Sequence, residues 1–201
     1  MRALFAPLIA VVIAAAPSAA ESSPLAEVSA HLRAVTTMTA DFVQTDQKGR
    51  TVSGKLSLKQ PGRVRFQYQK GVPLLIVGDG SALWMIDYSV RQVSRWPVRD
   101  SPLSVLIDPR KDISRFARIT ASPPPGIVAV EARDPKHPEF GTITIAFARG
   151  SGPADLILQG WTVVDAQNGR SIVRLSNQRY GGPVSDRAFN WDDPRPKGTP
   201  K

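Results

Sequence analysis

The chain has 201 residues, of which 42% are hydrophobic and 21% charged, a composition that fits one ordinary globular domain. It contains no cysteine and only two histidines, which excludes disulfides, thiolate metal sites, cysteine nucleophiles and a three-histidine zinc site. The formal net charge of +9 favours anionic membrane surfaces, acidic partners or nucleic acid.

Residues 1–20 have the pattern of a cleaved secretory signal. A positive start at Arg2 precedes a short apolar run, and Ser18 and Ala20 meet the small-residue requirement for cleavage after Ala20. The apolar run is shorter than the roughly 20 residues needed to cross a bilayer, which argues against an uncleaved anchor. We expect residues 21–201 to be exported and to fold as a single domain, for which nucleic acid is the least suitable partner.

Two short segments are predicted to be helical. Ser23 can cap a helix that begins at Pro24, whose apolar residues recur at intervals of three and four: Leu25, Val28, Leu32 and Val35. This helix should end near residues 36–37. Ser101 and Pro102 open a second, strongly apolar helix over residues 102–107.

The remaining chain alternates apolar and polar residues with a period of two, which predicts antiparallel strands. The expected strands are 41–47, 51–59, 63–69, 74–77, 83–88, 91–96, 116–121, 127–132, 142–148, 156–165, 172–178 and a last one around 188–191. Lys48-Gly49, Asp79-Gly80 and Asn168-Gly169 are typical turn residues. Regularly spaced short strands indicate a sandwich, a barrel or a large curled sheet.

Catalytic motifs are missing from the sequence. It has no G-x-S-x-G elbow, glycine-rich phosphate loop, H-E-x-x-H motif or EF-hand pattern. We expect His31 and His137 to be surface residues, and turns or the C-terminus account for Asp79, Asp165 and Asp192. The sequence therefore predicts a protein that is not an enzyme and carries no cofactor or metal.

One face of the predicted sheet carries more apolar surface than two short helices are certain to fill. Leu56, Leu58, Val64, Phe66 and Tyr68 share this face. The helices either complete an ordinary core or cover the face loosely and leave an apolar cavity for a ligand. Periodicity alone leaves both alternatives open.

Ordered motifs along the chain resemble the LolA family of periplasmic lipoprotein carriers of Gram-negative bacteria. They are MTADFVQT (38–45), GKLSL (54–58) followed by QPGRVRF (60–66), IVGDG (76–80) with Leu83-Trp84, RQV (91–93), SPLSVL (101–106) and FNW (189–191). Each motif is weak alone, but together they cover nearly the whole mature chain in the expected order.

The resemblance implies a mainly β (α+β) fold, namely an incomplete antiparallel β-barrel, or half-barrel, covered by a lid of short helices. It also implies a monomer that takes lipoproteins by their acyl chains from an inner-membrane ABC transporter and delivers them to an outer-membrane receptor or to the outer membrane itself. Where the family often has an arginine that helps to hold the lid, this chain has Gln60, and Arg63 or Arg65 is a possible replacement.

Two groups of candidate site residues follow. Acyl-chain contacts are predicted at Leu56, Leu58, Val64, Phe66, Tyr68, Trp84, Leu103, Val105 and Leu106. Lid or partner contacts are predicted at Arg63, Arg65, Arg91 and Arg95, the last two within a basic stretch that runs to Arg118 and that is equally typical of a solvated surface.

Two other classes of function compete with the carrier. A periplasmic sensor or regulator of similar half-barrel shape would also bind lipids or lipoproteins, and an attached second domain would favour it. A lipid hydrolase would need a nucleophile beside a base, for which only the two histidines are on offer.

Overall fold

The computed structural model describes residues 23–97, 104, 108, 112–115, 117–121, 123–133, 138 and 141–196. Its elements in chain order are α1 (Pro24–Ala34), β1 (Thr37–Thr45), β2 (Thr51–Lys59), β3 (Arg63–Tyr68), β4 (Leu74–Asp79), β5 (Ala82–Asp87), β6 (Gln92–Pro97), η2 (Ile113–Arg115), β7 (Ala117–Ile119), β8 (Ile127–Arg133), β9 (Thr142–Arg149), η4 (Pro153–Asp155), β10 (Leu156–Val164), β11 (Arg170–Tyr180) and η5 (Asp186–Phe189).

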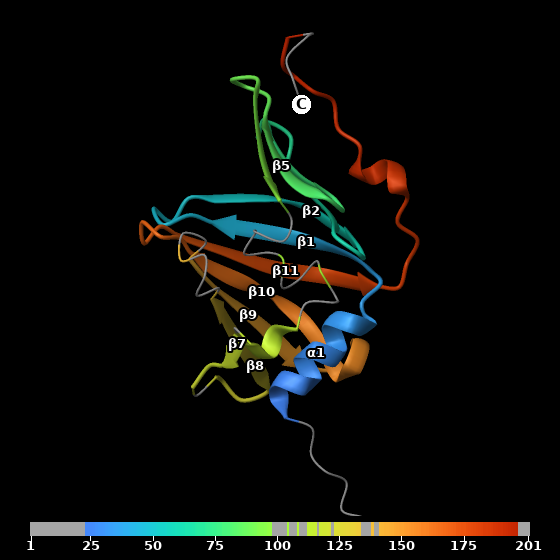
Figure 1. Cartoon of the computed structure of the whole chain (residues 1–201), viewed down its shortest axis with the longest axis vertical. Coiled ribbons are helices and arrows are strands. Elements are labelled where there is room, and N and C mark those ends of the chain that lie inside the picture. Colours follow the sequence, from blue (N-terminus) through green and yellow to red (C-terminus); the bar gives the residue numbers. More distant parts are fainter. Residues whose placement is uncertain are drawn as a thin grey trace, which may run out of the picture.

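The described strands form one antiparallel sheet in the order β6-β5-β4-β3-β2-β1-β11-β10-β9-β8-β7. Sequential strands pair with one another on each side, and the pairing of β1 with β11 joins the two halves. Figure 1 shows this continuous sheet, with α1 lying beside its β8–β10 end. The terminal strands β6 and β7 do not pair with each other, so the sheet stays open, as predicted for an incomplete barrel.

The two faces of the sheet differ in character. We call the face that carries Phe42, Phe66 and Phe147 the inner face, because these residues belong to the buried cluster that also contains Val28 and Leu32 of α1. The alternate residues form the outer face. Strand β1 illustrates the pattern, since Met38, Ala40 and Phe42 are buried while their neighbours are more exposed.

Two β-bulges interrupt the regular pairing of the described strands. One lies in β11 opposite Thr39 and Asp41, where Asn177 has a φ of 55°. The other lies in β10 between Leu158 and Gly160, where Gly160 has a φ of 146°. A bulge bends its strand and increases the local twist, so both help a long sheet to curl.

The predicted turns are confirmed. Gly49, Gly80 and Asn168 all have positive φ, at 76°, 100° and 64°. Helix α1 is also confirmed: the Ser23 hydroxyl accepts a hydrogen bond from the Ala26 N–H at 3.3 Å, and the chain turns extended at Val35. The predicted signal segment lies outside the described residues, as does most of the second helix, of which only Ser104 is described, as helical and buried.

The prediction of a strand around residues 188–191 is wrong. Residues Asp186–Phe189 form a short 3-10 helix, because the Ser185 hydroxyl accepts from the Arg187 N–H at 3.3 Å and caps it. Phe189 and Trp191 pack instead against a second, smaller cluster on the outer face that contains Leu75, Val77 and Ile86. The C-terminal segment therefore runs along the outer face of the β3–β5 part of the sheet, as the red chain in Figure 1 shows.

Candidate functional site

The five sheet residues predicted to contact acyl chains lie together on the inner face. Leu56, Leu58, Val64, Phe66 and Tyr68 are each at most 5% exposed and belong to the buried cluster to which α1 contributes Val28 and Leu32. Strand pairing places Leu56 opposite Phe66 and Leu58 opposite Val64. The result is a continuous apolar surface on the β2–β3 part of the inner face.

Four aromatic rings form the centre of this surface. Phe42 meets Phe66 edge to face at 5.5 Å between centroids and Tyr68 at 5.2 Å, and Phe66 meets Trp161 at 5.9 Å. Phe42 packs directly over Gly54, where an added Cβ would lie 2.7 Å from its ring. Glycine at position 54 therefore allows the rings to approach the sheet.

Phe42 and Trp161 were missing from the predicted contacts. Phe42 could have been found, because it alternates with Met38 and Ala40 in β1. Trp161 could not, because strict alternation from Leu156 and Leu158 places it on the other face. The bulge at Gly160 shifts the phase by one residue and turns Trp161 inward.

Polar side chains border the apolar surface near the turn between β1 and β2. The Tyr68 hydroxyl donates to Gln44 Oε1 at 2.6 Å, and Gln44 Nε2 donates to Ser171 Oγ at 3.2 Å. Burial raises the pKa of Tyr68 to about 12, so its hydroxyl keeps its proton at all ordinary pH values. This end of the inner face can hydrogen-bond the polar part of an amphiphile whose chains lie against the rings.

Trp84 is not beside Phe66, contrary to the predicted grouping. It pairs across the strands with Val77 on the outer face and packs in the smaller cluster. Its Nε1 donates to Asp79 Oδ2 at 2.7 Å, its ring lies 5.3 Å from that of Trp191, and Arg95 lies 5.4 Å from its centroid. Trp84 therefore helps to hold the C-terminal segment.

Trp96 is an inner-face aromatic residue that the prediction also missed. It lies opposite the buried Leu83 on the edge strand β6 and is 41% exposed. An exposed indole at the rim of an apolar face is placed to meet a ligand or a partner.

The candidate arginines on β3 lie on the face of the sheet away from α1. Arg63 and Lys59 both pair with Asp186, and Arg65 Nη1 donates to the carbonyls of Ala188 and Asn190 at 3.2 and 2.9 Å. Arg63 and Arg65 therefore bind the C-terminal segment on the outer face. Arg91 lies exposed in the β5–β6 turn, with a φ of 54°.

Gln60 lies in the turn between β2 and β3. Its backbone N–H donates to the Thr36 carbonyl at 2.8 Å, close to the point where α1 leads into β1. Leu103, Val105 and Leu106, the predicted lid contacts, lie outside the described residues.

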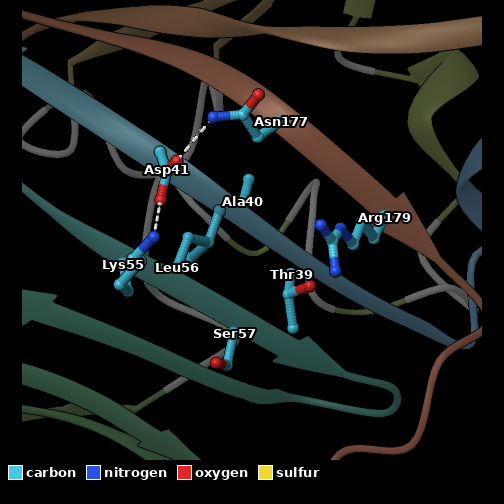
Figure 2. A pocket seen from close by; sticks show the side chains of 8 residues that line it. All are labelled: Thr39, Ala40, Asp41, Lys55, Leu56, Ser57, Asn177 and Arg179. Carbon is cyan, nitrogen blue, oxygen red and sulfur yellow. Dashed lines mark hydrogen bonds and ion pairs between the residues drawn. The ribbon is translucent and has the colours of Figure 1, made fainter.

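The outer face carries a polar groove of about 660 Å³ over β1, β2 and β11. Figure 2 shows the side chains that line it, Thr39, Ala40, Asp41, Lys55, Leu56, Ser57, Asn177 and Arg179. Asp41 pairs with Lys55 and accepts from Asn177 Nδ2 at 2.7 Å, and these contacts lower the pKa of its carboxyl group. Its charged lining suits polar groups, so the apolar inner face is the better candidate for acyl chains.

Comparison with known proteins identifies the family. Residues 33–192 match the family described as "Outer membrane lipoprotein carrier protein LolA". The chain belongs to the LolA family. An outer-membrane lipoprotein carrier protein of Chromobacterium violaceum is 29% identical over 97% of this chain and 96% of its own length, and one of Coxiella burnetii is 25% identical over 71% and 67%.

Among solved structures, an uncharacterized conserved protein from Thermus thermophilus aligns with a TM-score of 0.51. The alignment covers 88% of this chain and 96% of that chain at 11% identity, and so shows a shared fold alone. Membership of the LolA family makes the chain a lipoprotein carrier in general terms. Among the helices described, none has both the length and the apolar character of a membrane span.

Proposed function

We propose that this LolA-family protein binds the acyl chains of lipoproteins on its inner face and shuttles them through the periplasm without catalysing a reaction. It receives them from an inner-membrane ABC transporter and passes them to an outer-membrane receptor or to the outer membrane itself. The observation that carries the proposal is the apolar face of the sheet, whose aromatic centre belongs to the same buried cluster as Val28 and Leu32 of α1.

The apolar face and helix α1 together would allow a carrier both to bind acyl chains and to release them. Each methylene moved from water into an apolar site contributes roughly 0.8 kcal/mol, so a lipoprotein with several long chains resists leaving a membrane. A carrier has to offer comparable apolar surface and still release its cargo. Val28 and Leu32 of α1 cover part of that surface, so moving the helix aside offsets part of the gain from acyl burial.

The proposed contacts follow the structure where it is described. Leu56, Leu58, Val64, Phe66 and Tyr68 stay in the set, joined by Phe42, Trp161 and the rim residue Trp96. Leu103, Val105 and Leu106 remain proposed contacts from the second helix, and Trp84 is replaced because it faces the other side of the sheet.

Site-specific photocrosslinking tests the proposal. A photoreactive amino acid at Phe66 points into the inner face, and the same amino acid at the neighbouring, exposed Gln67 points to the outer face. Irradiation of cells that express each variant should give lipoprotein adducts from position 66 and none from position 67. Equal adducts from both positions, or adducts from position 67 alone, would reject the inner face as the binding site.

A further inference from the structure

Two side-chain contacts tie α1 to the β9–β10 hairpin. Arg149 Nη1 pairs with Glu27 Oε2 at 2.8 Å, and His31 Nδ1 donates to the Pro153 carbonyl at 2.7 Å. Glu27 and His31 are four residues apart, so both side chains project from the same side of the helix. The hairpin thus holds the helix at two points one turn apart.

His31 is a buried residue, contrary to the expectation that it lies on the surface. It is 1% exposed, and its ring meets Phe147 edge to face at 5.1 Å and Tyr180 at 5.8 Å. Because a carbonyl only accepts, Nδ1 carries the proton of the neutral ring. The helical spacing could have revealed this burial, because His31 follows Val28 by three residues and precedes Val35 by four, which puts it on the apolar face.

The surroundings of His31 favour the neutral imidazole. Burial lowers its pKa from the ordinary value of 6.5, while backbone contacts at Pro153 and Leu156 oppose part of this effect. In the described part of the chain, the charged groups on the elements packed around α1 are Glu27 and Arg33 on the helix itself, Arg149 on β9, Asp155 on η4, the mutually paired Arg118 and Glu131 on β7 and β8, and the exposed Arg133 at the end of β8. Tyr180 on β11 is neutral, because burial raises the pKa of its hydroxyl.

The loop that supplies the carbonyl has an unusual backbone. Ala154 and Asp155, directly after Pro153, have φ values of 50° and 57°, and non-glycine residues rarely adopt this left-handed region. Such conformations persist where the surrounding structure requires them. Here they belong to the tight turn that presents the Pro153 carbonyl to His31.

We propose that His31 is the positioning residue that keeps α1 closed over the inner face, and that protonation of its ring releases the helix. The inference rests on the proposed function in one respect, namely that acyl chains bind on the inner face, whose β8–β10 part α1 covers. It assigns to His31 the latch role that the sequence left open at Gln60, since Arg63 and Arg65 bind the C-terminal segment instead.

The direction of the pH effect follows from linkage. Above pH 6.5 the ring is neutral in both the open and the closed state, so closure has its full stability. As the pH falls below 6.5, the exposed ring of the open state binds a proton and the buried ring resists it. The open-to-closed ratio therefore rises, by up to about tenfold per pH unit, until the pH passes the lower pKa of the closed state.

A single-thiol reporter measures this opening directly. The chain has no cysteine, so Val28→Cys places one thiol at a position of α1 that is 0% exposed. Its labelling rate, divided by the rate in the unfolded chain at the same pH, gives the opening equilibrium. We expect this quotient to rise severalfold from pH 7.5 to pH 5.5 and to stay flat when His31→Asn is added, because asparagine can donate as Nδ1 does but does not titrate.

Three controls separate the latch from other effects. Ala82→Cys, 0% exposed in β5, reports global unfolding, and its quotient should stay well below that of Val28→Cys at every pH, because the helix opens without unfolding the sheet. His137→Asn removes the other histidine without changing the response. NMR titration of His31 in the unaltered chain should give a pKa below 6.5. A pKa at or above 6.5, or a pH response that persists in His31→Asn, would overturn the proposal.

The assay uses no cargo, so its outcome is independent of the carrier proposal. A pH-dependent opening without lipoprotein adducts at position 66 would support the His31 latch and reject the inner face as the acyl-binding site. Adducts at position 66 with an opening of α1 that does not depend on pH would support the binding site and reject the latch.

Discussion

Tyr68 combines an apolar contact with a protected hydroxyl group on the inner face. Burial raises its pKa to about 12 in the folded protein, whereas the hydroxyl of the unfolded chain ionises near pH 10. The stabilising effect of the raised pKa is complete below pH 10 and is lost as the pH rises toward 12.

Tyr68→Phe should therefore weaken the alkaline sensitivity of the fold. Between pH 10 and pH 12 the unfolding equilibrium constant of the unaltered protein should rise by up to about tenfold per pH unit more than that of the variant. Urea denaturation at a series of pH values measures both slopes, with pH 7–9 as the range in which the two slopes should agree. Identical slopes above pH 10 would show that the hydroxyl is not protected.

Sequence predicts single residues well where the strand period is unbroken. Leu56, Leu58, Val64, Phe66 and Tyr68 lie in β2 and β3, which pair without a bulge, and all five face inward as expected. Prediction fails where a bulge shifts the alternation, or where strand pairing determines which face of a strand points inward. A bulge turns Trp161 inward, and only the pairing of β5 with β4 puts Trp84 outside.

At the scale of elements, the C-terminal segment is a strap on the outer face. The sequence around Phe189 and Trp191 suggested a strand, because apolar periodicity cannot distinguish a short strand from a capped helical turn that covers a cluster. Trp191 lies against Trp84, and Arg65 binds two carbonyls of the segment. The strap therefore depends on contacts that link residues more than a hundred positions apart.

Trp191→Ala should loosen this strap. Losing the contact with Trp84 costs about 1.5 kcal/mol of docking free energy, which corresponds to roughly tenfold faster hydrogen exchange at the amides of Ala188 and Asn190. Hydrogen exchange read by mass spectrometry checks this, and Trp96→Ala, on the other face, is the matched control. Unchanged exchange in Trp191→Ala would show that the polar contacts of Arg65 and Asp186 suffice.

In helix α1 the local sequence pattern predicts the bounds of the element but not its contacts with distant parts of the chain. Its capping serine, first-turn proline and apolar spacing predict where the helix begins and nearly where it ends. The partners of Glu27 and His31 lie more than a hundred residues away on the β9–β10 hairpin. No local pattern specifies such a contact, so the latch emerges only from the fold.

At the scale of the whole molecule, an open sheet with one apolar face needs a cover. The edge strands β6 and β7 do not close on each other, and the bulges in β10 and β11 help the sheet to curl. Under the proposed function, acyl chains replace part of the cover that α1 gives to this face of the sheet. The family match over residues 33–192 spans all of its strands.

Native mass spectrometry with a triacylated lipopeptide tests this central claim most directly. The purified protein is mixed with the lipopeptide or with the same peptide lacking its acyl chains. We predict a one-to-one complex with the acylated form, no complex with the bare peptide, and weakened binding in Phe66→Asp, with circular dichroism confirming that the variant is folded. Equal binding of the two peptides, or no binding of the acylated one by the folded protein, would contradict the account.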